Sequence, residues 1–281
     1  MKKLVLVFSI LSAIAFAEIL DPSFGALKIS GDGWMSVGWN CAGISSAEDD
    51  FIYVDVVYRT NGFLDMKSFS LEYVQARNQE RALAGSLGVY RVFSGYDMER
   101  LGLVYKISGA NSGTNWGVGI GIERVRDEMS PDGFYSAFLE VGFLGKLSEN
   151  LEYAFSLRKI RLWSERLDSY LLGDFGVSIG YKTKLLDISS GVLMYEAEYI
   201  RPFLGIDLKF DWGGLGLGGE MVFRWSDYSF TPRLEGSLYF EKSPLTFGVY
   251  GGYMFETFSD TGIEREMIMD TVLALFTKVN L

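Results

Sequence analysis

Three short motifs contain residue types that could do chemistry. Residues 176–180 (GVSIG) fit the G-x-S-x-G pattern of a serine nucleophile, residues 156–159 (SLRK) fit S-x-x-K, and residues 214–219 (GLGLGG) fit the G-x-G-x-x-G pattern of a dinucleotide site. The 281-residue chain contains no histidine, however. Catalytic triads, Cys-His pairs and histidine metal sites are therefore excluded.

The surroundings of each motif argue against catalysis. A nucleophile elbow needs a strand-to-helix turn, but Ser178 lies within an alternating, strand-like pattern. Residues three apart on a strand point to opposite faces, so we expect Lys159 to lie on the face opposite Ser156. After the glycines, the sequence continues as the strand-like MVFRW, where a dinucleotide site needs a helix. We therefore predict no catalytic residue, no cofactor, no metal site and no enzyme activity.

Charged residues that alternate with apolar ones are the remaining candidates. They are Arg100, Lys106, Glu123, Glu152, Arg158, Asp174, Asp207, Lys209, Glu220, Arg224, Arg233 and Glu235. Both signs occur in adjacent segments, so these side chains could form cross-strand ion pairs. They could also line a channel and set its ion preference. The acidic runs at 48–50 and 127–132 lack EF-hand spacing and are interpreted as solvated loop charge.

The segments that carry these charges have the two-residue period of β-strands. In residues 115–125 (NWGVGIGIERV), tryptophan, valine and isoleucine alternate with glycine and glutamate. About fifteen segments of roughly 9 to 14 residues show this pattern, separated by turn residues such as Asn61-Gly62. The sequence predicts an antiparallel meander of many strands.

The composition of the two strand faces indicates which one meets water. A soluble sandwich would crowd its non-core face with Lys, Glu, Thr and Gln, whereas here that face is rich in Gly and Ser. A membrane barrel places apolar residues against lipid and polar ones inside, with aromatic girdles at both interfaces. The candidate interfacial aromatics are Trp34, Trp39, Trp116, Trp163, Trp212 and Trp225.

The N-terminus has the layout of a cleaved secretory signal peptide. Lys2 and Lys3 precede an uncharged run from Leu4 to Phe16, and the small-residue pattern Ala15-Phe16-Ala17 follows. We assign residues 1–17 to this signal and residues 18–281 to a single barrel domain. Residues 18–50 are either the first strand or strands, or a segment outside the wall.

The chain resembles the outer-membrane β-barrel (porin-like) class of bacteria, without matching one family within it. The resemblance rests on the signal peptide, the two-residue repeat over most of 25–281, and the terminal segment TVLALFTKVNL. Barrels of this class commonly end on an aromatic residue, whereas this chain ends on Leu281. The resemblance implies export to the bacterial outer membrane, with membrane lipid and the insertion machinery as partners.

The fold prediction is an all-β, closed, antiparallel up-and-down transmembrane barrel. Since such barrels have even numbers of strands, we expect fourteen, with twelve or sixteen as alternatives. With the C-terminus in the periplasm, the long connections at 125–133, 163–169 and 256–267 all lie outside.

The expected function is a narrow porin-like channel for passive diffusion of small hydrophilic solutes or ions, because about fourteen strands lie between filled and open barrels. The alternatives are a non-conducting barrel that anchors or organises the envelope, and a soluble periplasmic barrel that binds a lipid-like ligand. The net charge of −10 argues against nucleic acid as a partner. The oligomeric state is not predicted.

Overall fold

The structure, a computed structural model, describes residues 40–60, 65–78, 82–94, 98–127, 130–166, 173–195, 199–224, 229–257 and 267–281. The predicted signal peptide, Trp34, Trp39 and Trp225 lie outside these residues, as does most of the segment before Phe51.

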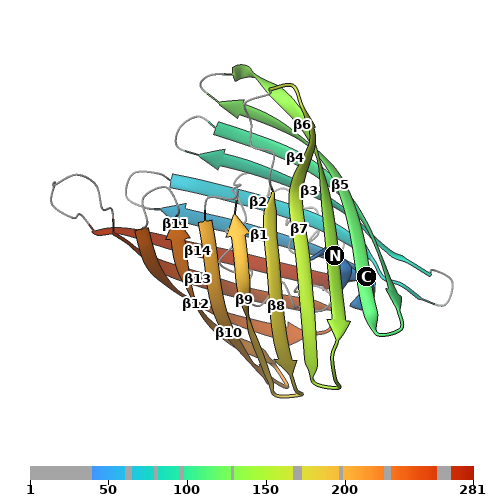
Figure 1. Ribbon diagram of the computed structural model, residues 1–281. Coiled ribbons are helices and arrows are strands. Elements are labelled where there is room, and N and C mark those ends of the chain that lie inside the picture. The colour runs from blue at the N-terminus through green and yellow to red at the C-terminus, as the bar shows by residue number, and fades with distance from the viewer. Residues whose placement is uncertain are drawn as a thin grey trace.

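Fourteen antiparallel strands form a closed barrel in which each strand pairs with its sequence neighbours and β1 pairs with β14 (Figure 1). The strands are β1 (Phe51–Thr60), β2 (Asp65–Gln75), β3 (Ala84–Ser94), β4 (Met98–Asn111), β5 (Thr114–Asp127), β6 (Ser130–Lys146), β7 (Leu151–Ser164), β8 (Asp174–Lys182), β9 (Leu186–Tyr195), β10 (Tyr199–Phe210), β11 (Gly213–Arg224), β12 (Ser229–Lys242), β13 (Leu245–Thr257) and β14 (Met267–Asn280). The predicted fold class and strand number are confirmed. Since β1 pairs directly with β14, the wall closes without any residue before Phe51.

Alternation along each strand separates an inward from an outward face. On β4, Gly102, Val104 and Lys106 are buried, whereas Leu101 and Tyr105 are 51% and 52% exposed. The neighbouring β5 shows the same division, with Gly117, Gly119 and Gly121 inward and Val118, Ile120 and Ile122 outward. Along the middle of these two strands the outer surface is therefore apolar and the inner surface carries glycines and charged residues, as the sequence pattern predicted.

The two ends of the barrel differ in their connections. The end that carries the C-terminus, here called the terminal end, has short turns, and the amide of Leu281 donates to the carbonyl of Asp50 at 2.9 Å. Its β4–β5 turn has positive φ at Ser112 and Gly113, 47° and 85°, as a type I′ hairpin requires. The strand order places the predicted long connections at 163–169 and 256–267 at the opposite, distal end. The predicted connection at 125–133 lies at the same end but is wrong as a long loop, because β5 continues to Asp127 and β6 begins at Ser130.

Two β-bulges interrupt the pairing of β6 with β7. The register shifts between Leu139 and Val141, where Arg158 and Lys159 of β7 together oppose Glu140, and again between Ala137 and Phe138. Lys159 has a φ of 51°. An extra residue in one strand changes which face the following side chains occupy.

Residues Cys41–Ser46 form a short 3-10 helix, η3, capped by the side chain of Asn40, whose Oδ1 accepts from the amide of Ala42. This helix contacts β3, β4, β5 and β6 and contributes buried residues to the barrel interior. None of the described helices is long and apolar enough to cross a membrane.

Candidate functional site

The barrel interior is the candidate functional site, and its first component is the segment at residues 40–47. The Nδ2 of Asn40 donates to the carbonyl of Phe143 at 3.3 Å, and the Oγ of Ser108 donates to the carbonyl of Ala42 at 3.0 Å. The Nδ2 of Asn115 donates to the Oγ of Ser46 at 2.8 Å. These contacts hold η3 against the inner wall near the terminal end.

Glycines in the wall make room for this segment. A Cβ at Gly117 would overlap the backbone of Cys41 and Ala42, and a Cβ at Gly142 would overlap the side chain of Asn40. The wall and η3 are therefore in backbone contact at β5 and β6, which only glycine permits.

The thiol of Cys41 is enclosed by this packing. Burial, followed by the negative charge of Glu140, raises the pKa of the Cys41 thiol from 9.0 to about 12. The thiol is therefore neutral at physiological pH and is a poor nucleophile.

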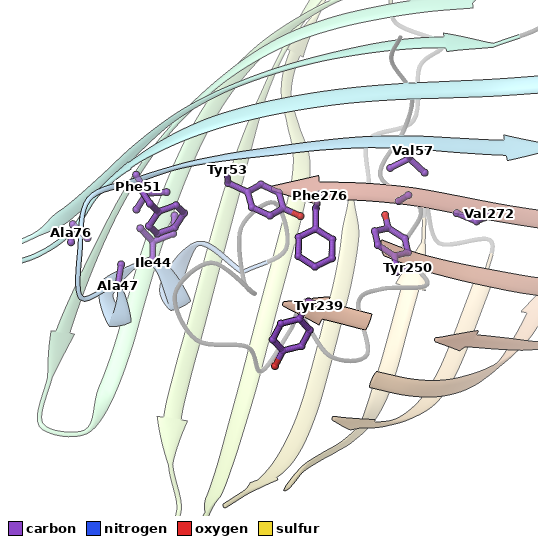
Figure 2. Packing of buried hydrophobic residues seen from close by; sticks show 13 residues of the cluster. Ile44, Ala47, Phe51, Tyr53, Val57, Ala76, Tyr239, Tyr250, Val272 and Phe276 are labelled. Carbon is purple, nitrogen blue, oxygen red and sulfur yellow. The ribbon is translucent and has the colours of Figure 1, made fainter. Parts of the chain in front are cut away.

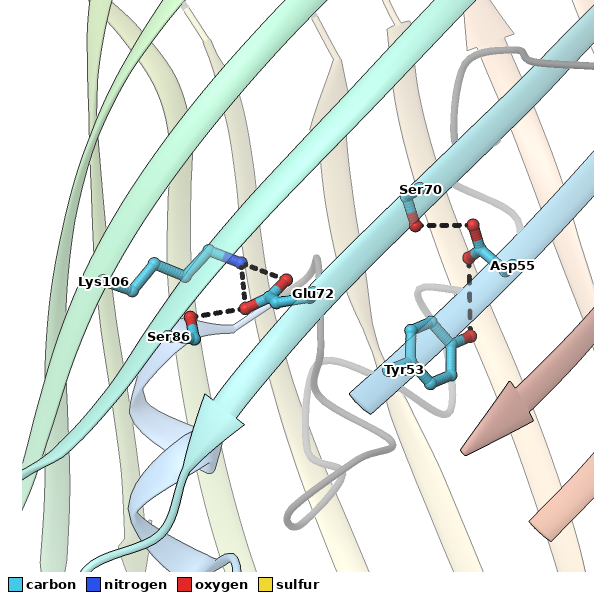
Figure 3. Close-up of polar contacts among 6 residues, drawn as sticks. All are labelled: Tyr53, Asp55, Ser70, Glu72, Ser86 and Lys106. Carbon is cyan, nitrogen blue, oxygen red and sulfur yellow. Dashed lines mark hydrogen bonds and ion pairs between the residues drawn. The ribbon is translucent and has the colours of Figure 1, made fainter. Parts of the chain in front are cut away.

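A buried ion pair lies next to η3 (Figure 3). The Nζ of Lys106 donates to both carboxylate oxygens of Glu72, at 3.0 and 2.9 Å, and the Oγ of Ser86 donates to Oε1 of Glu72 at 2.5 Å. The side chains of Lys106 and Glu72 are only 5% and 7% exposed. Glu140 is also buried here, and both Lys106 and Glu140 pack over Gly119.

A second charged group surrounds Glu123, further toward the distal end of β5. Its carboxylate accepts from the hydroxyl of Tyr90 at 2.8 Å, from the Oγ of Ser136 at 3.3 Å and from the Nζ of Lys159 at 3.4 Å. The same ammonium lies 4.4 Å from the ring centroid of Tyr90. Glu123 of β5 is thus bound by side chains from three other strands, β3, β6 and β7.

Lys159 contradicts the expectation that it and Ser156 occupy opposite faces of β7. Ser156 is buried on the inward face, and Lys159 also points inward, as its contacts with Glu123 and Tyr90 show. The reason is the bulge at residues 158 and 159, which places two consecutive side chains on the same side. Regular alternation cannot anticipate such an insertion.

The other half of the interior holds further ion pairs. Arg201 of β10 and Arg233 of β12 both contact Oε1 of Glu220 on β11, the latter at 3.6 Å. The hydroxyl of Tyr239 donates to Oδ2 of Asp207 at 3.1 Å. These side chains are buried, so the charged groups interact with one another with little access to water.

A largely apolar surface lines the interior along β1, β12, β13 and β14 (Figure 2). It includes Val57, Tyr239, Tyr250, Val272 and Phe276, which are buried side chains of the inner wall. Ile44 and Ala47 of the N-terminal segment belong to the same cluster. The rings of Tyr53 and Phe276 stack with centroids 6.3 Å apart. The interior thus has a charged side and an aromatic side.

The structure places most of the predicted lumen charges on the inner wall. Those with buried or half-buried inward side chains are Arg100, Lys106, Glu123, Glu152, Arg158, Asp174, Asp207, Lys209, Glu220, Arg233 and Glu235. The side chain of Arg224 is outside the described part of the structure. The predicted charges form several separate groups along the wall. Between the Glu123 and Glu220 groups, Arg158 pairs with Asp174 at 3.9 Å, Glu152 pairs with Lys182 at 2.7 Å, and Lys209 pairs with Asp187 at 2.6 Å.

Sequence reasoning missed several charged residues that belong to these groups, among them Glu72, Glu140, Lys159 and Arg201. These four all contact or pack against a predicted residue. Glu72 and Glu140 carry the same alternation signal as the predicted residues, since apolar neighbours flank each of them. Lys159 carries no such signal because the bulge changes its face.

The described candidate aromatics lie near strand ends on the outer surface. Trp163 is exposed at the distal end, and Trp212 is exposed in the turn between β10 and β11 at the terminal end. The Trp212 ring stacks on Phe210 at 5.0 Å and contacts Phe240 at 5.3 Å. Trp116 is half-buried and packs over Gly109. Aromatic residues thus flank the apolar band at both ends.

Three solved structures share this architecture. The toluene transporter TodX of Pseudomonas putida gives a TM-score of 0.59 at 11% identity, covering 94% of this chain and 98% of its own. The toluene transporter TbuX of Ralstonia pickettii gives 0.58 at 7% identity, covering 94% and 99%. The CymD monoaromatic hydrocarbon channel gives 0.56 at 9% identity, covering 92% and 97%.

At these identities the likeness shows the fold alone, which is that of the outer-membrane β-barrel class. No protein-family model and no curated protein sequence matches the chain.

Proposed function

We propose that this protein is a narrow channel of the bacterial outer membrane, through which small hydrophilic solutes or ions diffuse passively. The observation that carries the proposal is the contrast between the two faces of the wall: the outward face exposes many large apolar side chains, whereas the inward face of strands such as β4, β5, β7 and β11 carries buried charges or glycines. That contrast suits a wall with lipid on one side and a hydrated path on the other. Insertion by the outer-membrane assembly machinery follows from this location as part of the proposal.

The buried interior argues that the path is narrow. Glu72, Lys106 and Glu123 are nearly inaccessible to water, and η3 occupies the inner face of β5 and β6. A barrel of fourteen strands lies between eight-stranded barrels filled by side chains and the open porins of 16 to 18 strands. We therefore expect small conductance steps, with modest cation preference from the net charge of −10.

Planar-bilayer recording on the refolded full chain tests the proposal. The expected result is reproducible conductance steps, with a reversal potential that favours cations under a KCl gradient. An anion-selective reversal potential would contradict the cation preference. A folded barrel that gives no steps would instead support the alternative of a non-conducting barrel that anchors or organises the envelope.

Small aromatic molecules are a second candidate solute class. The aromatic and aliphatic side chains of the inner wall at β1, β12, β13 and β14 favour it. The structures of similar fold named above are described as toluene transporters and a monoaromatic hydrocarbon channel. Toluene that occupies this lining should reduce ion conductance in a concentration-dependent way. Equal conductance with and without toluene would remove this candidate.

A further inference from the structure

The outward face of β2, β3, β4 and β5 carries a group of basic side chains, here called the outer basic cluster. Its members are Lys67, Arg91, Arg124 and Arg126, gathered around Glu99. The strand registers place them in two adjacent rows near the distal end. Lys67, Phe93, Glu99 and Arg126 form one row. Arg91, Leu101 and Arg124 belong to the next, closer to the middle of the barrel.

The contacts of the cluster hold the arginines in place without neutralising them all. Arg91 and Arg126 share the carboxylate of Glu99, at 2.6 and 3.5 Å. Arg126 also donates to the carbonyl of Pro131, and Arg124 donates to the carbonyl of Asp132. Backbone carbonyls carry no net charge, so among the described ion pairs of the two rows Glu99 is the one carboxylate that the arginines share. Arg91 and Arg126 remain 39% and 49% exposed.

The described outward side chains of β8–β14 differ from this cluster. Among the side chains that the structure describes on β8–β14, the outward residues toward the distal end are apolar, aromatic or small. Lys242 faces outward at the terminal end, and Asp132 is exposed at the start of β6. The outer basic cluster is therefore a local feature, although the chain as a whole is acidic.

The surface between the arginines of the second row, and next to that row toward the middle of the barrel, is apolar. Leu101, Leu103 and Ile122 face outward and are 51%, 44% and 47% exposed. Positive guanidinium groups therefore stand at the edge of a band suited to acyl chains. Arginine binds phosphate through paired, charge-assisted hydrogen bonds, which gives this edge a preference for phosphate.

We propose that the outer basic cluster binds the phosphate group of a phosphorylated lipid in the distal leaflet, with its acyl chains along Leu101, Leu103 and Ile122. The inference goes beyond passage through the barrel. It requires only that the outward face meets lipid, so a barrel that conducts no ions could still have this site.

Native mass spectrometry of the refolded full chain in neutral detergent tests the proposal. The probes are dioleoylphosphatidate, dioleoylglycerol, which has the same chains without the phosphate, and inorganic phosphate. The test variant is Arg91→Gln/Arg124→Gln/Arg126→Gln. The matched control, Arg77→Gln/Lys184→Gln/Lys242→Gln, removes the same charge from exposed positions at the terminal end. Heat-modifiable migration on gels shows that each variant is folded.

Phosphatidate should bind the unaltered protein and the control variant with similar affinity. It should bind the test variant at least about tenfold more weakly, a loss of about 1.4 kcal/mol of binding free energy. Dioleoylglycerol should bind weakly to all three. Equal phosphatidate affinity in the test and control variants would overturn the proposal, as would equal binding of dioleoylglycerol. Competition by inorganic phosphate at the concentration of the lipid would show an anion site instead of a lipid site and would also overturn it.

Discussion

At the scale of single residues, the charges inside the barrel act first on one another. Glu72, Lys106 and Ser86 form a hydrogen-bonded group with almost no access to water. Breaking one partner of a buried ion pair is costly because the remaining charge loses both water and its counter-ion. Lys106, which sequence analysis proposed as a channel-lining charge, thus braces the wall through its ion pair with Glu72.

Replacing Lys106 with Met should destabilise the barrel by about 3–5 kcal/mol, because Glu72 then keeps a buried charge without its partner. Urea unfolding from lipid vesicles, followed by tryptophan fluorescence, measures the free energy of unfolding. The matched control is Lys242→Met at an exposed outward position, which should change that free energy by less than about 0.5 kcal/mol. Similar effects of the two substitutions would show that the ion pair does not support the fold.

Cys41 should be almost inert to iodoacetamide at pH 8 in the folded barrel, because burial and Glu140 raise the pKa of its thiol to about 12. The comparison is the Cys41→Ser/Ser112→Cys variant, whose thiol lies in an exposed turn. Labelling followed by mass spectrometry gives both rates. Equal rates at pH 8 would show that η3 does not enclose Cys41.

The same pKa shift links stability to pH. The folded-state pKa lies above the ordinary value of 9.0, so the folded barrel retains a proton that the unfolded chain loses. The stabilising contribution of the neutral thiol is complete below about pH 9 and is lost as the pH rises toward 12. In the Cys41→Ser variant, the free energy of unfolding should therefore fall less between pH 9 and pH 12 than in the unaltered protein.

At the scale of elements, alternation alone predicts much of the wall. The segments around Leu101, Phe155, Ile179 and Leu208 are strands with the faces expected from their sequence. Ser178 lies within β8 and the glycines of 214–219 lie within β11. This agrees with the prediction that both motifs are parts of strands. These features follow from local patterning, which a single sequence contains.

Features that depend on long-range contacts could not be predicted in this way. Gly117 and Gly142 look like any other inward glycines, yet they contact a segment about 70 to 100 positions away in the sequence. Lys159 faces inward because of a bulge set by its pairing with β6. The ion pair between Arg201 and Glu220 depends on the register in which β10 pairs with β11. A single sequence indicates that register only through the length and position of the turn between the two strands.

Gly117→Ala should loosen η3, because the added methyl group would overlap the backbone of Cys41 and Ala42. We expect faster alkylation of Cys41, a loss of about 1–3 kcal/mol in stability, and larger conductance steps if η3 restricts the channel. Gly219→Ala is the matched control, since its nearest neighbour would lie 3.6 Å away. An alkylation rate for Gly117→Ala equal to that of the control would contradict the contact.

At the scale of the whole molecule, the architecture is a closed barrel with an even number of strands, in which the first and last strands pair. The sequence predicted fourteen strands, and the structure has them in a single closed sheet. Pairing across the seam between β1 and β14 joins residues at opposite ends of the chain. The local sequence pattern does not show that β1 pairs with β14. Closure of the sheet was nevertheless expected, because an open sheet would leave the hydrogen-bonding groups of its two edge strands unpaired.

A disulfide across the seam tests closure. Val56 and Leu275 are partners in the β1–β14 register, so cysteines at these positions in a Cys41→Ser background should crosslink readily on oxidation. Val56→Cys/Leu273→Cys, offset by two residues, is the control and should crosslink poorly. Efficient crosslinking of the offset pair alone would show a different register.

Fractionation tests the membrane assignment. Because the outward face exposes apolar residues such as Leu217, Leu234 and Leu275, the protein should stay with the envelope after a carbonate wash, and its unboiled form should migrate faster on a detergent gel. Recovery in the soluble periplasmic fraction would instead support the soluble lipid-binding alternative.

The seam between β1 and β14 also determines the order in which this protein can be completed. These two strands are the first and last of the wall, so their contact has the largest sequence separation in the fold and the highest loop-closure entropy. Until β14 has paired with β1, the edge of β1 has unpaired backbone hydrogen-bonding groups that can bind other chains. An incomplete chain of this protein is therefore a predicted aggregation hazard, and a factor that shields the edge of β1 would matter most just before closure.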